Sequence, residues 1–592
     1  MKKKFNLTYI VLSTAVLFSA CSKDFLDRRP RDLIIEEDAY GSQSGLEALT
    51  AQLYNDMQLE DFEYHVAEQA GYLATVTDEA VRSYTWGSGT INGTLVGNWF
   101  GYWDYAAVRR VNDFMQKLPD ANVSDELKTR FHAEAQFIRA FHYFQMVKRY
   151  GGVPLVTEAA QYAVGEDPTE LFVPRNKEHE IYDFIASELD EAIANLPENY
   201  SSSDRNRVNK YTALALKSRA MLYAASIAKY GQVQLNGLVG ISATKAEQYW
   251  QASYDASKRI IDAGVYQLLD EGEDKAANFQ NLFLTENSQE VIFNKVYRTP
   301  EVGHSYDFYN APQSFKVDYG CATNPTLDLV EEFEYIDGSS GELKVTDASG
   351  EPILYENPFD IFNDKDPRLL ASIMLPFSNW QGGQLEIRRG IVVNGSKRTS
   401  EDLTAGYPNN TSAFKIVGKD GPLTTGDPSK TGFYVKKSMN PNTRVNFGES
   451  STPFIVFRYG EVLLNYAEAA MELGRNTEAL EAVNQIRSRA GIATRNSINL
   501  EQVRHERKVE LAFENHRLWD MRRWRVATEV LNNYQAHALY PWLVWEEGKD
   551  VSEMSYIFEK VNAPKNPRTF PEKLYYEPLP QGNPTYIQNP LY

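Results

Sequence analysis

Cys21 is the residue whose position most clearly predicts a chemical modification. It follows three lysines at 2–4 and an apolar stretch from Phe5 that ends in Ser19 and Ala20. This order is typical of a secretory signal, and a cysteine directly after the cut is typical of bacterial lipoproteins, in which its thiol is acylated. The stretch is shorter than the roughly 20 residues of a spanning helix. We therefore predict a signal peptide over 1–20 and a lipid-anchored chain, with a plain secreted protein and a buried Cys21 as the alternative.

Other side chains offer little metal or redox chemistry. Cys321 is the second of only two cysteines, so no intrachain disulfide is expected once Cys21 is acylated. None of the eight histidines has a partner at the i, i+4 spacing of a helical zinc site. We expect no zinc-type metal site and no cofactor, while a calcium ion bound by exposed acids stays an open alternative.

Asp364 and Asp366 are a carboxylate pair of the kind that a glycoside hydrolase needs. They directly precede Pro367 and Arg368, and aspartates in such a setting commonly cap backbone groups in a turn. The chain contains no nucleophile elbow, zinc-protease motif or nucleotide-binding glycine loop. It is therefore predicted not to be an enzyme, with a glycoside hydrolase as a remote alternative.

Aromatic side chains make up 12% of the chain, and two polar stretches combine them with hydrogen-bonding groups. The first stretch is 77–87, and the second covers 305–310 and 318–320. Aromatic rings stack on the apolar faces of sugars and peptides, while Asn, Asp and Arg bond to hydroxyls. The net charge of −19 argues against a nucleic-acid partner. These features favour a binding protein.

Helices are predicted on both sides of a loop-rich segment. Apolar residues recur every three or four positions in several stretches of 33–270, as in Phe137, Phe141 and Phe144. From 271 to 450, Gly, Pro, Asn and Asp interrupt this pattern, and short strands are expected at 290–293 and 390–393. Helices are expected again from Phe457, where small residues have the spacing of a tetratricopeptide repeat: Ala467, Ala470, Gly474, Ala479, Val483 and Ile486. We predict a mostly α fold, a tetratricopeptide-like helical scaffold with a loop-rich region that contains small β elements.

Several segments, taken in order, resemble the SusD/RagB family of nutrient-binding outer-membrane lipoproteins. The N-terminal segments are 21–27 with Pro30, Ile138–Phe144 and Tyr150–Val156. The C-terminal segments are Glu461–Ala469, Asn484–Arg487, Glu506–Arg507, Glu510–Glu514, Arg517–Trp524, Pro578–Pro580 and Gln588–Tyr592. Together they extend over the whole chain.

The resemblance implies a single domain over 21–592, with a helical part at about 33–270, a variable ligand-binding region at about 271–450 and a tetratricopeptide-like part at about 451–592. Members of this family sit on the cell surface, cap a SusC-type TonB-dependent transporter and deliver glycans or, in some cases, peptides. Charged residues of the matching helices have apolar neighbours, so we expect them to form buried ion pairs. These residues are Arg139, Glu468, Arg487, Glu506, Arg507, Glu510, Glu514 and Arg517.

The two aromatic stretches fall where the family's binding loops lie. The predicted ligand-binding residues are Asp78, Arg82, Tyr84, Trp86, Tyr306, Tyr309, Asn310 and Tyr319, with Trp380 and Gln381 as further candidates. The rings of Trp86, Tyr306 and Tyr319 are expected to stack on a glycan, and Asp78, Arg82 and Asn310 to bond to its hydroxyls. Three alternatives stay open: the rings fill a small core of the loop region, the ligand is a peptide, or the chain is a helical adaptor without a small ligand.

Overall fold

The computed structural model describes residues 39–65, 72–84, 99–161, 165, 167–201 and 204–592. Cys21, the predicted signal and Trp86 lie outside these ranges. Within them, the α-helices are α3 (Gln43–Asn55), α4 (Tyr105–Lys117), α5 (Asp125–Tyr150), α6 (Glu178–Asn195), α7 (Lys210–Tyr230), α8 (Ala246–Ala263), α9 (Lys275–Leu282), α10 (Tyr306–Asn310), α11 (Leu327–Glu332), α12 (Pro367–Ser372), α13 (Tyr459–Glu472), α14 (Asn476–Ala490), α15 (Leu500–Glu510), α16 (Arg517–Arg523) and α17 (Ala527–Val530).

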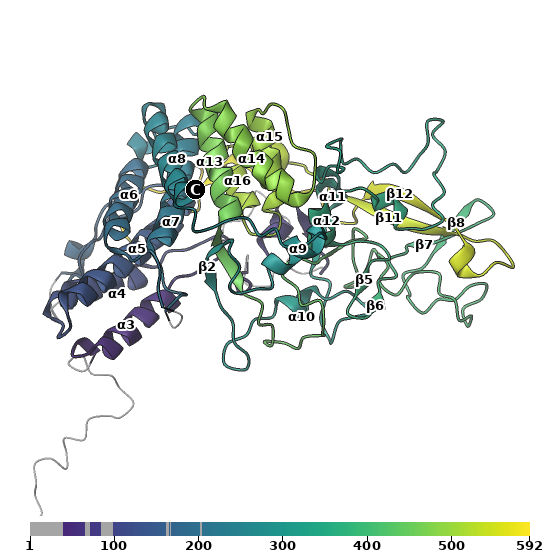
Figure 1. Cartoon of the computed structure of the whole chain (residues 1–592), viewed down its shortest axis with the longest axis horizontal. Coiled ribbons are helices and arrows are strands. Elements are labelled where there is room, and N and C mark those ends of the chain that lie inside the picture. Colours follow the sequence, from purple (N-terminus) through teal and green to yellow (C-terminus); the bar gives the residue numbers. More distant parts are fainter. Residues whose placement is uncertain (1–38, 66–71, 85–98, 162–164, 166, 202–203) are drawn as a thin grey trace, which may run out of the picture.

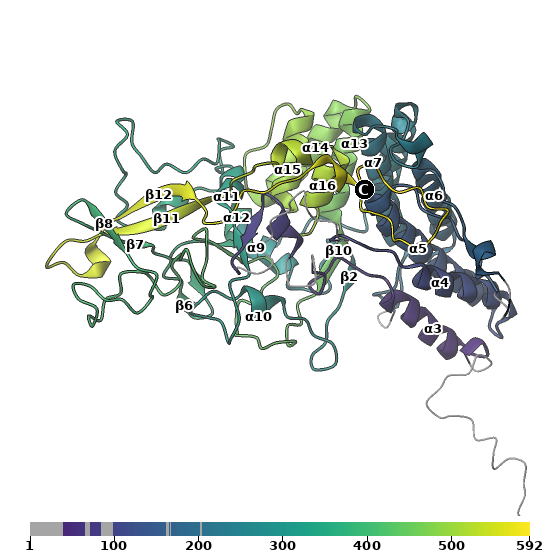
Figure 2. The same ribbon diagram turned by 180° about the vertical axis from the view of Figure 1, so that it is seen from behind.

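The strands are short. They are β1 (Ala80–Arg82), β2 (Val291–Lys295), β3 (Thr323–Pro325), β4 (Ile373–Met374), β5 (Asn379–Trp380), β6 (Gly383–Gln384), β7 (Gly390–Val393), β8 (Ser396–Thr399), β9 (Tyr434–Val435), β10 (Phe454–Arg458), β11 (His537–Val544) and β12 (Tyr556–Asn562). Figure 1 shows α3–α8 at one end of the molecule, α13–α16 beside them toward the middle, and β5–β8, β11 and β12 toward the other end. The same division is visible from behind, in Figure 2. The predicted α-rich fold with small β elements is confirmed.

Helix α5 is the centre of the helical part. Every residue from Ala133 to Tyr150 is buried, so this helix is enclosed on all sides rather than on one face. It ends at Gly151, whose φ is +74°. A Cβ at this position would lie 2.9 Å from the carbonyl oxygen of Leu238, so both the backbone conformation and the close packing require glycine.

Helices α6, α7, α8, α13 and α14 pack in succession, each against the next. The predicted helix pair with small contact residues is confirmed, because Ala467 and Ala470 of α13 and Ala479 of α14 are all fully buried. The start of this pair differs slightly from the prediction. Phe457 belongs to β10, which pairs with β2, and the helix begins two residues later.

The largest sheet has the strand order β12-β11-β7-β8. Strand β7 agrees with the predicted strand at 390–393, and β2 overlaps the one predicted at 290–293. Strands β11 and β12 were not expected, since 451–592 was predicted to be tetratricopeptide-like. Strand β11 runs parallel to β7, which lies some 150 residues earlier in the chain, so its pairing depends on a distant segment.

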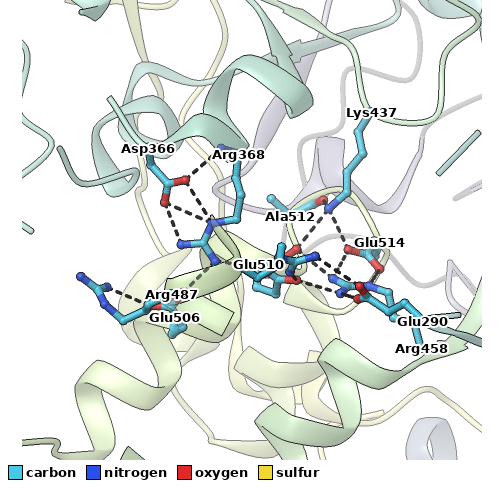
Figure 3. Close-up of polar contacts among 11 residues, drawn as sticks. Glu290, Asp366, Arg368, Lys437, Arg458, Arg487, Glu506, Glu510, Ala512 and Glu514 are labelled. Carbon is cyan, nitrogen blue, oxygen red and sulfur yellow. Dashed lines mark hydrogen bonds and ion pairs between the residues drawn. The ribbon is translucent and has the colours of Figure 1, made fainter. Parts of the chain in front are cut away.

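The expected buried ion pairs are confirmed, and the largest group of them joins the loop-rich part to the helices (Figure 3). Arg368 of α12 donates to Glu506 at 2.7 Å and to Glu510 at 2.8 Å. Arg458 donates to the other oxygen of Glu510 at 2.8 Å. The remaining predicted residues also pair, in Arg487–Glu506, Arg458–Glu514, Arg139–Glu188, Glu468–Arg523, Arg507–Asp520 and Arg517–Asp78.

The pKa of Glu510 illustrates why this group is stable in the ionised form. Burial raises the pKa of a carboxyl, but the guanidinium groups of Arg489, Arg458 and Arg368 hold that of Glu510 well below its usual value. The three guanidinium groups therefore favour the ionised form of Glu510.

None of the described helices combines the length and the apolar character that a membrane-spanning helix needs.

Candidate functional site

The two aromatic stretches singled out in the sequence lie side by side. Strand β1 from the first stretch pairs antiparallel with β3, which directly follows the second, so that Arg82 lies opposite Thr323. The contact continues beyond the strands, where the Tyr84 hydroxyl donates to the Gly320 carbonyl at 2.7 Å. Segments more than 200 residues apart in sequence thus form one unit.

Most of the predicted residues of the first stretch are buried in this unit. Asp78 is 4% exposed, and its carboxylate accepts from Arg517 Nε at 2.8 Å and pairs with Lys508 Nζ at 2.9 Å. Burial alone would raise its pKa, but these two cations hold it far below the usual value. Asp78 therefore fastens β1 to the C-terminal helices.

Arg82 and Tyr84 are buried as well. The Arg82 guanidinium lies 5.0 Å from the centre of the Tyr84 ring, a cation–π arrangement. Burial lowers the pKa of Arg82 to about 10. Trp86, the ring expected to stack on a ligand, lies outside the described residues.

Tyr306 and Asn310 of α10 point inward. The Tyr306 ring packs against Phe62 and Tyr72 at centroid distances of 4.6 and 5.1 Å. Asn310 is fully buried, donates Nδ2 to the Tyr306 carbonyl at 2.9 Å and accepts from the Thr323 amide at 3.1 Å. Tyr306 and Asn310 therefore pack in a small local core, which is one of the alternatives that the sequence analysis left open.

Tyr309 and Tyr319 lie at the surface, and the structure brings them together with two rings that the sequence prediction did not include. The aromatic surface cluster consists of Phe308, Tyr309, Tyr319 and Phe447, with ring centroids 5.3–6.4 Å apart in the contacting pairs. Tyr319 is 49% exposed and Phe447 is 64% exposed. Within the described part of the chain, they are the only aromatic side chains among the exposed large hydrophobic residues.

Phe447 is held in place by the loop 440–450. Asp307 accepts from the Asn440 amide at 2.6 Å, and the Ser305 hydroxyl accepts from the Gly448 amide at 3.1 Å. Gln381, a further candidate from the sequence, donates Nε2 to the carbonyl oxygens of Asn440 and Thr443 at 2.9 and 2.6 Å. It therefore supports this loop. Its neighbour Trp380 is only 3% exposed and belongs to the core beneath.

One signal in the sequence could have identified Phe447. A large apolar residue between Asn446 and Gly448, in a segment without periodicity, has no helix or strand face to bury it. Phe447 lies outside both aromatic stretches, whereas Phe308 lies inside the second one but was not among the predicted ligand-binding residues.

Polar groups surround the cluster. The exposed Asp318 precedes Tyr319 in the chain, and Asn446 donates to Glu449 at 2.8 Å beside Phe447. Burial and the nearby Glu63 carboxylate raise the pKa of Tyr309, so its hydroxyl stays protonated. The arrangement offers flat apolar faces with hydrogen-bonding groups at their edges, as a ligand with both apolar faces and hydroxyls requires.

No arrangement suited to metal chemistry was found: the described residues contain no group of three or more His, Cys, Asp or Glu side chains that could hold a metal ion. Asp366 caps the N-terminus of α12 and bonds to Arg368, in agreement with the turn interpretation of the Asp364–Asp366 pair.

A separate cavity of about 650 Å³ lies near the C-terminus, between the end of α7 and the last residues of the chain. Arg525 stacks against Tyr575 and Tyr576 in its wall, at 4.7 and 4.8 Å from the ring centres. None of the predicted ligand-binding residues lines this cavity.

Comparison with known proteins gives consistent matches. The sequence profile described as "SusD family" matches residues 289–592, and the profile described as "Starch-binding associating with outer membrane" matches residues 24–222. A SusD-like protein of Bacteroides ovatus is 24% identical over 551 residues, which cover 89% of this chain and 84% of the relative.

Solved structures share the fold. A SusD-like carbohydrate-binding protein of Bacteroides fragilis superimposes with a TM-score of 0.68 at 23% identity, covering 93% of this chain and 99% of that one. A laminarin-binding SusD-like protein superimposes with a TM-score of 0.58 at 19% identity, covering 93% and 100%. With a family profile that matches more than half of its length, the chain belongs to the SusD family.

Proposed function

We propose that this protein is a surface lipoprotein that binds a glycan at the aromatic surface cluster and delivers it to a SusC-type TonB-dependent transporter. One observation carries the proposal: the two exposed aromatic rings of the described chain lie in the same cluster, next to the stretches that the sequence analysis selected. Exposed rings that gather at one place have no role in the core and mark a binding surface.

The ligand class is supported by the relatives. One solved structure of this fold is named for laminarin binding, and one matching profile is described as starch-binding. In this proposal Tyr319 and Phe447 stack on sugar rings, Tyr309 adds a hydroxyl at the edge, and Trp86 adds a further ring. Asp78, Arg82, Tyr84, Tyr306 and Asn310 hold the cluster from beneath.

The location and partner follow from the N-terminal sequence and the family. Acylation of Cys21 would tether the chain to the outer membrane, which agrees with the second profile's description. An anchored binder needs a route across that membrane for its ligand, and the transporter provides it. No catalytic step is proposed for this chain.

The test is a binding measurement on mature protein without residues 1–20. We expect Phe447→Ala and Tyr319→Ala each to weaken binding of the preferred glycan, sought among laminarin and starch oligosaccharides, by more than tenfold, about 1.4 kcal/mol. Leu354→Ala is the matched control, because Leu354 is 62% exposed and lies in a different loop. Calorimetry measures the affinities. Equal affinities for wild type and both cluster variants would remove the cluster from the site, and binding of peptides alone would favour the peptide alternative.

A further inference from the structure

A second polar cavity, of about 240 Å³, lies between the start of α7 and strand β2. Five asparagines line it: Asn199, Asn206, Asn209, Asn287 and Asn294. Tyr200 and Tyr266 contribute aromatic surface. We call this the amide cavity. Its lining includes no residue of the aromatic surface cluster, and β2 lies between α7 and α10 in both views of the molecule (Figures 1 and 2).

The inner wall of the amide cavity is held by hydrogen bonds within the fold. Asn209 caps α7 by accepting from the Thr212 amide at 2.9 Å, and its Nδ2 donates to the Tyr266 hydroxyl at 3.3 Å. Asn294 is 6% exposed and donates Nδ2 to the Glu286 carbonyl at 2.9 Å. The Tyr266 ring also packs edge-on against Tyr211, at 5.6 Å. The wall is therefore shaped before any ligand arrives.

The outer rim offers unused hydrogen-bonding groups. Asn199, Asn206 and Asn287 are exposed, and their side chains make no hydrogen bond with another described residue. Each primary amide carries two donors and one acceptor oxygen. A sugar hydroxyl both donates and accepts hydrogen bonds, so several amides can satisfy several hydroxyls at once. Carboxylates only accept and cationic side chains only donate, so neither could do this alone.

The charges at the rim are balanced. Glu286 is paired with Arg298 through both carboxylate oxygens, and Arg205 lies 3.7 Å from it. These arginines lower the pKa of Glu286, so its carboxylate stays ionised at neutral pH and its charge is balanced by theirs. A cavity with paired charges and unused amides favours a neutral, hydroxyl-rich ligand over an anion.

We propose that the amide cavity is a second carbohydrate-binding site, one that takes a single neutral pyranose unit. Its volume is below the 300–1,000 Å³ or so of typical ligand pockets, which suits one ring and not a chain. The proposal takes its ligand class from the proposed function. Two sites on one chain would raise the apparent affinity for a long glycan without any new contact at either site.

The test begins with a background variant in which the first site is removed, Tyr319→Ala with Phe447→Ala. Ligand-observed saturation-transfer NMR is recorded with glucose, galactose, mannose and N-acetylglucosamine, each as the free sugar. We expect saturation transfer to at least one sugar in this background, and its loss on adding Asn206→Ala and Asn287→Ala. Asn532→Ala, another exposed asparagine with no side-chain partner among described residues, is the matched control and should change nothing.

Two results would overturn the second site. One is an absence of saturation transfer from the background variant to all four sugars. The other is transfer that persists when Asn206 and Asn287 are both alanine. Neither result tests the aromatic surface cluster, because that site is tested by the glycan affinities of Phe447→Ala and Tyr319→Ala. Either proposal can therefore be refuted without the other. The substituted asparagines are exposed, and circular dichroism of each variant serves as the check on folding.

Discussion

The substitution Glu510→Gln tests whether the buried ion-pair group holds the two parts of the molecule together. The change keeps the shape of the side chain and removes one negative charge that three arginines share. Arg368 would retain Asp366 and Glu506, and Arg458 would retain Glu290 and Glu514. Among the carboxylates of the described residues, Arg489 would retain Glu290 alone, at 3.3 Å.

The expected destabilisation depends on how many carboxylate partners each arginine loses. Arg489 is 2% exposed, and its Nε already has no hydrogen-bond partner among the described residues. Removing one partner of a buried ion pair typically costs about 3–5 kcal/mol, because an uncompensated charge is left in the interior. We expect a destabilisation in this range for Glu510→Gln, with most of it arising at Arg489.

Equilibrium urea denaturation, followed by circular dichroism, measures the effect. Glu342→Gln is the matched control, because the Glu342 side chain is 75% exposed and, within the described part of the chain, pairs with Lys560 alone, at 3.3 Å. Loss of this charge should change stability by less than about 0.5 kcal/mol. If the uncompensated guanidinium is the cause, adding Arg489→Met to Glu510→Gln should restore part of the loss. The reasoning would be refuted if Glu510→Gln lowered the free energy of unfolding by less than about 1 kcal/mol, or if the double variant were less stable than Glu510→Gln alone.

Two further predictions concern Glu79 and Cys21. Burial raises the pKa of Glu79 to about 7 in the folded state from 4.5, so native Glu79 retains a proton that the unfolded chain releases, and its contribution to stability is lost as pH rises through 7. The free energy of unfolding of Glu79→Gln, relative to that of wild type, should therefore increase by about 2–3 kcal/mol between pH 4.5 and pH 8. Denaturation at both pH values measures this difference. A difference that does not change with pH would contradict the prediction. Cys21→Ser should abolish labelling by radioactive palmitate and release the protein from the outer-membrane fraction, and continued labelling would place the acyl chain elsewhere.

Local signals in the sequence were sufficient for the long helices, but not for the short helices α9, α10, α11 and α12, which lie in the segment predicted to be loop-rich. The stripe that contains Phe137, Phe141 and Phe144 lies inside α5, and α8 ends at Gly264, whose φ of +64° suits glycine. Periodicity and helix-ending glycines act within a few residues, so they can be read without knowledge of the fold. Strand β11 depends on β7, and no local pattern contains that pairing.

The candidate site was predictable only as a set of segments. Composition selected 77–87, 305–310 and 318–320, and the pairing of β1 with β3 places them together. Which side chains face outward was not predictable, because α10 is only five residues long and has no periodicity that distinguishes Tyr306 from Tyr309. Phe447 comes from a third segment, which contacts the cluster only through tertiary structure.

The buried members of the predicted site give the exposed ones their fixed position. A helix as short as α10 is not stable alone, because helix nucleation is unfavourable. The inward packing of Tyr306 and the two hydrogen bonds of Asn310 hold it in place, and the ion pair of Asp78 with Arg517 fixes the neighbouring strand. Rings that are already ordered lose little freedom when a ligand binds, so more of the contact energy remains as affinity. Substitution of a supporting residue should therefore weaken binding by loosening Tyr309 and Tyr319, although that residue never touches the glycan.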